Sequence, residues 1–318
     1  MKLQLLLLMF ASVLPSSAIP ANVTPRQLLA EGRADDAVRV LQQHVRLQPA
    51  DAESFNLLCR AYFMADDWDP ALEACQRAVS LAPQNSMYQL WLGRVYGEKA
   101  DHSSIFSAPG LAKQARSAFE RAVQLDPGNW EARADLGEFY AEAPGFIGGG
   151  KDKARAQADA LMAINPAMGH WVLARIAEKE KQPDVAEREY RAEIAASHSG
   201  ARAWLDLAGF LRYQKRYEEM KQALHTLDSS LLDRPEALLH AAQQLYRSDF
   251  DLPFAVGLLE RYLKNPVEDG PAFKAHDLLG QIYEKQGDKR AALDQFRAAL
   301  ALAHSYSRAQ ENLKRLER

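Results

Sequence analysis

Three features of the sequence combine residue types that could carry out chemistry. Residues 145–151 read Gly-Phe-Ile-Gly-Gly-Gly-Lys, as in a phosphate-binding loop, but Asp152 stands where Mg²⁺ binding needs a Ser or Thr hydroxyl. The segment Ser197-His198-Ser199-Gly200 sets a hydroxyl beside an imidazole but lacks the Gly-x-Ser-x-Gly pattern of a nucleophilic serine. None of the eight histidines has a metal-ligand spacing such as His-Glu-x-x-His. We therefore expect no enzyme activity, no cofactor and no metal site.

The composition describes a folded, mildly acidic chain. Of its 318 residues 47% are apolar and 25% are charged, with a net charge of −3. Because the chain has no basic excess, we expect no nucleic-acid partner. Residues 1–18 combine Lys2, an apolar run and a small-residue ending at Ala18, which predicts a cleaved secretory signal peptide. The expected product is periplasmic or secreted, and residues 19–318 contain no membrane span.

A repeat organises the rest of the chain. Pro49, Pro83, Pro127 and Pro166 each close a similar segment, and they are separated by 34, 44 and 39 residues. A period near 34 residues is typical of stacked helix pairs, because one pair cannot bury its apolar face alone. Small and aromatic residues recur in phase with this period. In four of the units they are Phe55, Leu58, Cys59, Tyr62, Ala71 and Ala78; Leu92, Gly93, Tyr96, Ala115, Phe119 and Ala122; Leu136, Gly137 and Tyr140; and Leu279, Gly280, Tyr283, Ala292, Phe296 and Ala299.

At these positions the chain resembles the tetratricopeptide repeat (TPR) family. The resemblance implies an all-α fold, a right-handed α-solenoid of antiparallel helix pairs with about eight repeats in residues 19–318. A C-terminal capping helix is expected within Ser305–Arg318. Thr24-Pro25 and Asp69-Pro70 each set a capping side chain before a proline, which predicts two helix starts.

Two insertions interrupt the period, near residues 97–113 and 141–150. Because the insertions fall in consecutive units, they would lie side by side and form one binding element, a lip on the edge of the superhelix. Alternatively, they are surface loops that have lengthened without a function, since a longer surface loop costs little stability. The glycines of the second insertion suit a hinge before a helix that begins near Lys151. A second interpretation is that their free N–H groups bind a carboxylate or another anion.

Cys59 and Cys75 fall on the two facing helices of one unit. In an oxidising compartment they would form a disulfide that closes 16 residues of chain. The alternative is a pair of buried free thiols that act as small hydrophobic residues.

The resemblance also implies a binding groove, because the first helices of TPR units line the inner surface. Projected onto this sequence, the groove residues are Asn56, Arg60, Trp91, Arg94, Trp171 and Arg175. Arginines beside tryptophans would suit a peptide with acidic side chains or a free carboxylate. Alternatively, the three arginines form salt bridges with acids of the same chain.

The expected function is therefore that of an exported, non-catalytic interaction module that binds a peptide or protein segment in its concave groove. The alternative is an exported protein that holds a small or lipid-like ligand inside the superhelix, with the two insertions as its lip.

Overall fold

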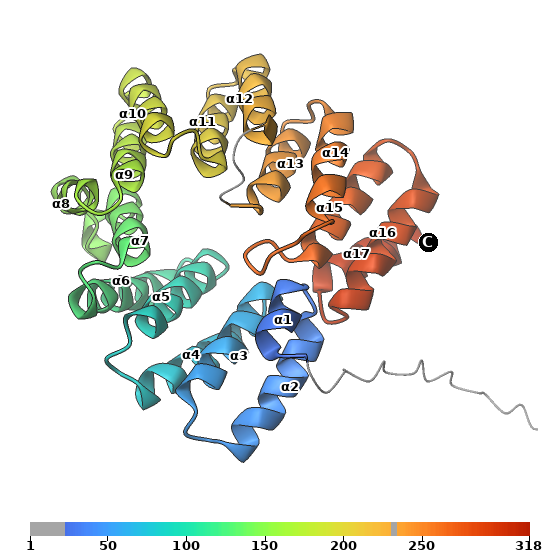
Figure 1. The fold of residues 1–318 in the computed structure, drawn as a ribbon, viewed down its shortest axis with the longest axis horizontal. Coiled ribbons are helices and arrows are strands. Elements are labelled where there is room, and N and C mark those ends of the chain that lie inside the picture. The colour runs from blue at the N-terminus through green and yellow to red at the C-terminus, as the bar shows by residue number, and fades with distance from the viewer. Residues whose placement is uncertain (1–22, 230–233) are drawn as a thin grey trace, which may run out of the picture.

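The computed structural model describes residues 23–229 and 234–318, which form a ring of helices (Figure 1). The predicted signal peptide lies outside the described residues. Eight consecutive antiparallel helix pairs are followed by one last helix, so the predicted all-α solenoid of about eight repeats is confirmed. The pairs are α1 (Pro25–Ala30) and α2 (Ala34–Leu47); α3 (Ala52–Met64) and α4 (Trp68–Leu81); α5 (Ser86–Asp101) and α6 (Ala108–Leu125); α7 (Trp130–Glu142) and α8 (Lys151–Met162); α9 (Pro166–Lys179) and α10 (Pro183–Ala196); α11 (Ala201–Tyr213) and α12 (Tyr217–Ser229); α13 (Ala237–Arg247) and α14 (Leu252–Tyr262); α15 (Ala272–Lys285) and α16 (Lys289–Leu302).

The last helix, α17 (Ser307–Leu316), covers the final pair. Ala309 is its one buried residue, and its last turn carries Lys314 and Arg315, where positive charge suits the helix dipole. Asn312 donates a hydrogen bond to Asp277 at 2.9 Å. This polar outer face makes α17 the end helix that the sequence predicts.

Glycine lets the two helices of a pair approach closely. A Cβ atom on Gly93 would lie 2.5 Å from the ring of Phe119, and one on Gly280 would lie 2.5 Å from the ring of Phe296. No real side chain tolerates such a contact with a ring that is itself buried. The recurring glycine and aromatic positions are therefore a packing signature of the core.

The turn inside most pairs uses one residue with left-handed backbone. These residues are Gly32, Asp66, Lys181, Lys215, Asp249 and Gly287, all with φ between 51° and 82°. The two pairs that carry the insertions differ: the described residues of the α5–α6 connection include no such residue, and the α7–α8 connection has Gly148, with a φ of 104°.

One of the two predicted helix starts is confirmed. Thr24 caps α1, accepting from the backbone N–H of Gln27, and Pro25 is the first helical residue. The prediction for Asp69 is wrong, because α4 begins earlier, at Trp68, directly after the left-handed turn at Asp66. The Asp69 carboxylate instead forms an ion pair with Lys99.

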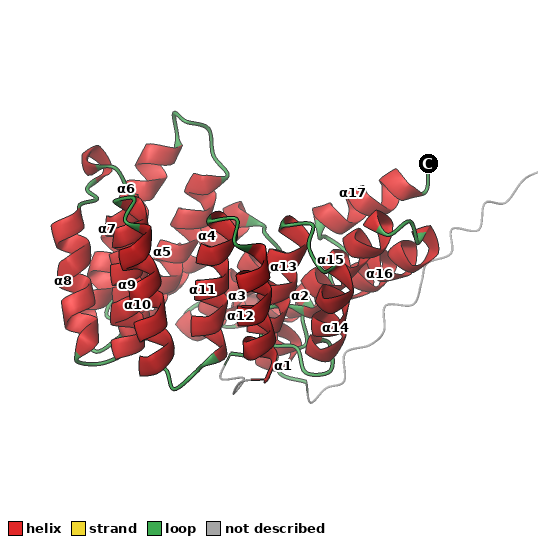
Figure 2. Cartoon of the chain, turned by 90° about the horizontal axis from the view of Figure 1, so that it is seen from above, coloured by secondary structure: helices red, strands yellow, loops and turns green. Residues whose placement is uncertain are grey.

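The insertions lengthen helices as well as loops. α5 and α6 span 16 and 18 residues, so the connection between them is only 102–107. The second insertion forms residues 143–150, with a short 3₁₀ turn at Gly145–Ile147. Arg116 of α6 donates to the carbonyl of Ile147 at 2.8 Å, which fixes the second insertion against the helix that follows the first. Figure 2 shows loops that rise beside α5, α6 and α7 on one face of the ring.

The first and last repeats meet, and we call this contact the closure seam. Arg60 binds both carboxylate oxygens of Glu268 at 2.6 Å, and Lys274 binds Asp66 at 2.7 Å. Asp35 accepts from the hydroxyl of Ser305 at 2.6 Å. Beneath these polar contacts, buried residues of the last repeat join the apolar cluster of the first repeats; they are Phe273, Ala299, Ala303, Tyr306 and Ala309.

Glu268 reaches the seam from a loop, residues 263–271, that projects toward the middle of the ring (Figure 1). The buried hydroxyl of Tyr262 accepts from the backbone N–H of Val267 at 3.0 Å and donates to the carbonyl of Gly270. These bonds hold the loop in one conformation.

Within the described residues no helix is both long and apolar enough to cross a bilayer.

Candidate functional site

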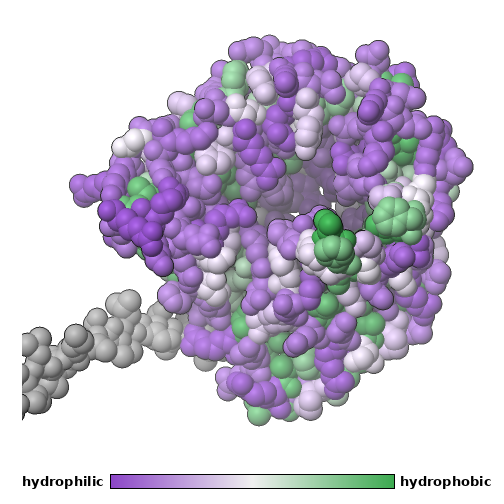
Figure 3. Space-filling view, turned by 180° about the vertical axis from the view of Figure 1, so that it is seen from behind, coloured by the Kyte–Doolittle hydropathy of each residue, from purple (hydrophilic) through white to green (hydrophobic). Residues whose placement is uncertain are grey.

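A cavity of about 650 Å³ opens into the ring between α5 and α7. Figure 3 shows the hollow that the ring surrounds. Five aromatic residues, Phe63, Trp91, Phe119, Trp130 and Phe139, form its apolar wall. Its charged residues are predominantly acidic. They are Glu98, Asp101, Glu131, Asp135, Glu138, Glu142 and Asp269, against Arg94, Arg202 and Arg234.

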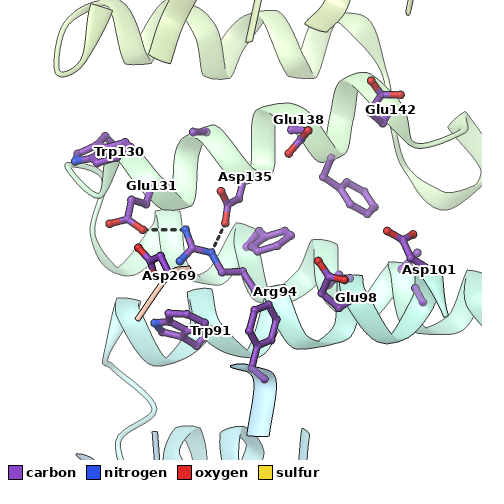
Figure 4. Close-up of a pocket in the computed structure, with 18 of the residues that line it drawn as sticks. Trp91, Arg94, Glu98, Asp101, Trp130, Glu131, Asp135, Glu138, Glu142 and Asp269 are labelled. Atoms are coloured by element: carbon purple, nitrogen blue, oxygen red, sulfur yellow. Dashed lines mark hydrogen bonds and ion pairs between the residues drawn. The ribbon is translucent and has the colours of Figure 1, made fainter. Parts of the chain in front are cut away.

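Arg94 forms ion pairs with the next repeat. Its Nε lies 2.7 Å from Asp135 and its terminal nitrogen lies 2.8 Å from Glu131, both on α7 (Figure 4). The guanidinium also stacks on Trp91 at 5.1 Å from the ring centroid. Burial alone would lower the pKa of Arg94, but the two carboxylates raise it above its ordinary value.

Arg60 and Arg175 are paired as well. Arg60 binds Glu268 across the closure seam and also stacks on Trp91, at 4.9 Å from the ring centroid. Arg175 binds Glu178 at 2.7 Å and Glu142 at 2.9 Å. All three predicted arginines thus form salt bridges within the chain, which was the alternative interpretation of the sequence.

The other predicted groove residues are largely buried. Trp91 and Trp171 are 8% and 7% exposed, and Arg202 stacks on Trp171 at 5.2 Å. Asn56 is 5% exposed and lies away from the cavity lining. Trp171 and Arg175 line a second cavity of about 310 Å³ that shares Glu138 with the first.

Sequence reasoning missed the acids that give the cavity its charge. Glu98 and Asp101 lie on α5 and face Glu138 and Glu142 on α7 (Figure 4). Burial, with the nearby charge of Asp101, raises the pKa of Glu98 above its ordinary value. Burial raises the pKa of Glu138 to about 7, although Arg175 opposes the shift.

A second group of buried charged residues lies near Glu138, the acid that lines both cavities. Glu193 is 1% exposed, and Asp206 binds Arg202 at 3.4 Å. Burial, followed by the charge of Asp206, raises the pKa of Glu193. The positive charge of Arg202 opposes the rise in the pKa of both carboxyl groups.

The backbone N–H groups of the glycine run are already hydrogen-bonded to carbonyl groups within the chain. The N–H groups of Gly148, Gly149 and Gly150 donate to carbonyls of Gly145, Pro144 and Tyr140. A Cβ on Gly149 would lie 1.8 Å from the carbonyl oxygen of Ala143, so close backbone approach explains that glycine. α8 begins at Lys151, where the hinge interpretation places it. The expectation that these N–H groups receive an anion is therefore wrong.

The remaining reactive residues have structural partners. Ser197 donates to the carbonyl of Ile194 at 3.1 Å, and His170 pairs with Glu189 at 2.9 Å. The described residues contain no group of three acidic, histidine or cysteine side chains that could hold a metal ion. Cys59 and Cys75 are joined by a disulfide between α3 and α4, and both are fully buried.

A stack of helical hairpins that bury their apolar faces against one another, with a cavity on the inner surface, defines a helical-repeat solenoid, a class that presents concave binding surfaces. Two segments, residues 28–94 and 273–306, match the family described as tetratricopeptide repeat. The chain therefore contains tetratricopeptide repeats, and its α-solenoid fold is of the kind that serves as a protein-interaction scaffold.

Known proteins share parts of this chain. The "Type IV pilus assembly protein PilF" of Pseudomonas aeruginosa is 33% identical over 122 residues, which cover 37% of this chain and 46% of PilF. The chain thus spans about half the length of that relative. Among solved structures, yeast Tom70 has a TM-score of 0.56 at 16% identity, over 89% of this chain and 58% of Tom70. A thermophilic TPR protein of Thermus thermophilus has a TM-score of 0.49 at 22% identity, over 59% of this chain and 97% of its own.

Proposed function

We propose that this protein is an exported, non-catalytic adaptor that binds a segment of a protein partner inside the ring. The observation that carries the proposal is the cavity between α5 and α7, which lies on the inner surface and is framed by the two insertions. Gly97, Asp101 and Ala112 of the first insertion line it, and Glu142 lines it beside the second. A volume of about 650 Å³ is within the usual range for ligand pockets.

The charge of the cavity favours a polypeptide over a lipid-like ligand. A lipid tail needs apolar walls, because an ionised carboxylate in contact with hydrocarbon loses its hydration. Here seven acidic side chains line the same space as the five aromatic rings. A polypeptide segment can satisfy both kinds of surface at once.

Residues 1–18 support export, and the relative that is named as a pilus assembly protein supports a role in assembling an envelope structure. Deleting residues 2–18 should retain the protein in the cytoplasm, as measured by cell fractionation. Unchanged distribution between the fractions would contradict export.

The binding site is testable by photocrosslinking in the native cells. A benzoylphenylalanine in place of Phe139, which is half-buried in the cavity wall, should form a covalent adduct with the partner. The matched control is the same amino acid at Arg290, an exposed position on α16 outside the cavity. Equal adduct formation at both positions would contradict binding inside the ring.

A further inference from the structure

The cavity holds carboxylates that the chain itself does not neutralise. Glu131 and Asp135 are bound by Arg94, and Asp269 is bound by Arg234 at 3.3 Å. In residues 23–229 and 234–318, by contrast, no side chain donates a hydrogen bond to, or forms an ion pair with, the carboxylate of Glu98 or Asp101. The cavity therefore has negative charge to spare, at the base of the first insertion.

Two aromatic rings that line the same cavity are also open. Trp91 is already in contact with two guanidinium groups, those of Arg60 and Arg94. Trp130 and Phe139 are half-buried in the cavity wall, and no lysine or arginine of the described chain stacks on either ring. Aromatic faces next to carboxylates are a surface that attracts an ammonium or guanidinium group.

Apolar side chains project from the two insertions that frame the cavity. Ile105 and Phe106, in the α5–α6 connection, are 82% and 90% exposed, and Phe146, in the second insertion, is 73% exposed. The bond from Arg116 to Ile147 ties the two insertions together. Large exposed apolar groups beside a polar cavity are typical of a protein interaction site.

We propose that the partner segment is basic and amphipathic: its lysine or arginine side chains enter the cavity to meet Glu98 and Asp101, and its apolar side chains cover Ile105, Phe106 and Phe146. This inference rests on the proposed function and names the chemistry of its partner. It replaces the acidic partner expected from the sequence, because the arginines on which that expectation depended are already paired. Charge complementarity favours a basic segment, because a negatively charged cavity repels an acidic one.

The probe is a fluorescein-labelled peptide that alternates lysine and leucine, titrated with the full chain and followed by fluorescence anisotropy. Its counterpart carries glutamate in place of lysine. We expect the lysine peptide to bind and the glutamate peptide not to bind. Binding should weaken between about 0.1 M and about 1 M salt, as the Debye length falls from about 10 Å to about 3 Å.

The decisive variant is Glu98→Gln with Asp101→Asn, which removes two charges from the cavity and should weaken lysine-peptide binding roughly tenfold. The matched control is Glu73→Gln with Asp159→Asn, which removes two exposed charges outside the cavity and should change binding less than about twofold. A third variant, Phe106→Ser with Phe146→Ser, should weaken binding several-fold through the lost apolar contact.

Equal effects of the cavity and control variants would overturn the proposal, as would equal binding of the glutamate peptide. Binding of the chain to phosphatidylcholine vesicles through Phe106 and Phe146, without binding of the lysine peptide, would identify a lipid surface as the occupant and also overturn it. A partner crosslinked at Phe139 through a segment without basic residues would leave the proposed function standing and refute this inference alone.

Discussion

Two glycines with the same backbone conformation allow the closure seam to be tested with a matched pair of variants. Gly32 and Gly287 have φ values of 71° and 82°, each in the turn between the helices of its repeat. A Cβ on Gly32 would lie 2.7 Å from the backbone nitrogen of Ala272, across the seam. A Cβ on Gly287 would meet nothing within 4 Å.

Alanine at either position adopts a left-handed backbone, at a local penalty of about 1 kcal/mol. Only Gly32→Ala adds a steric clash with backbone, so only this variant must displace the start of α15 from α1. The seam holds the Arg60–Glu268 pair, the Asp66–Lys274 pair and the Asp35–Ser305 contact. At about 1 kcal/mol for each partly exposed contact, loss of these three polar contacts alone removes about 3 kcal/mol of local stability.

Hydrogen exchange followed by mass spectrometry measures this difference. In Gly32→Ala, amides of α1, α2, α15 and α16 should exchange about a hundredfold faster than in the unmodified chain, the factor that corresponds to about 3 kcal/mol. In Gly287→Ala, faster exchange should remain confined to α15 and α16 and stay within about tenfold. Small-angle X-ray scattering should show a larger radius of gyration for Gly32→Ala alone.

Unchanged exchange of α15 and α16 in Gly32→Ala would refute the prediction, because the clash with Ala272 is what carries the effect of this substitution across the seam. The prediction also fails if Gly32→Ala leaves both the exchange and the radius of gyration unchanged.

Two further predictions concern the disulfide and the cavity acid. Replacing Cys59 and Cys75 with alanine should lower the free energy of unfolding by about 3 kcal/mol, the loop-entropy value for a closure of 16 residues, in urea denaturation; a reductant should then destabilise the unmodified chain and leave the variant unaffected. Because the pKa of Glu138 rises from 4.5 to about 7, its contribution to stability is complete below about pH 4.5 and is lost as the pH rises to about 7. Glu138→Gln, which leaves Arg175, Arg202, Asp135 and Glu142 in place around it, should flatten the pH dependence of the melting temperature in that window; an identical slope in both proteins would refute the shift.

The sequence predicts the repeats well because each helix pair is a local structure. The glycine and aromatic positions, such as Gly93 with Phe119, fall 26 residues apart in one hairpin, and the same physical contact recurs along the chain. Phase alone therefore identifies the pairs, their number and the end helix. The failure at Asp69 concerns only where α4 begins, since the left-handed turn at Asp66 sets that boundary.

The inner surface was harder to predict, because its charges pair between repeats. Arg94 reaches Glu131 and Asp135, which are 37 and 41 residues ahead, one lengthened period away. The signal was present, since the fourth repeat places Asp135 and Glu138 where neighbouring repeats have apolar residues and arginine. Reading each groove position against the next repeat would have paired the arginines and revealed the remaining acids.

The closure seam could not be found from periodicity. Arg60 and Glu268 are 208 residues apart, and their meeting depends on the small rotation added by every repeat between them. The loop that carries Glu268 lies in the most degenerate repeat, where the sequence pattern is weakest.

The ring has a consequence for how the chain reaches its native state. Most of its contacts form between neighbours, so individual hairpins can assemble rapidly and in any order. Arg60 and Asp66 emerge from the ribosome some 200 residues before Glu268 and Lys274, and until those appear the apolar surface that Phe273 and Tyr306 later cover faces solvent. The nascent chain thus exposes this apolar surface through most of its synthesis. The first repeats are therefore the part that a chaperone has most reason to bind.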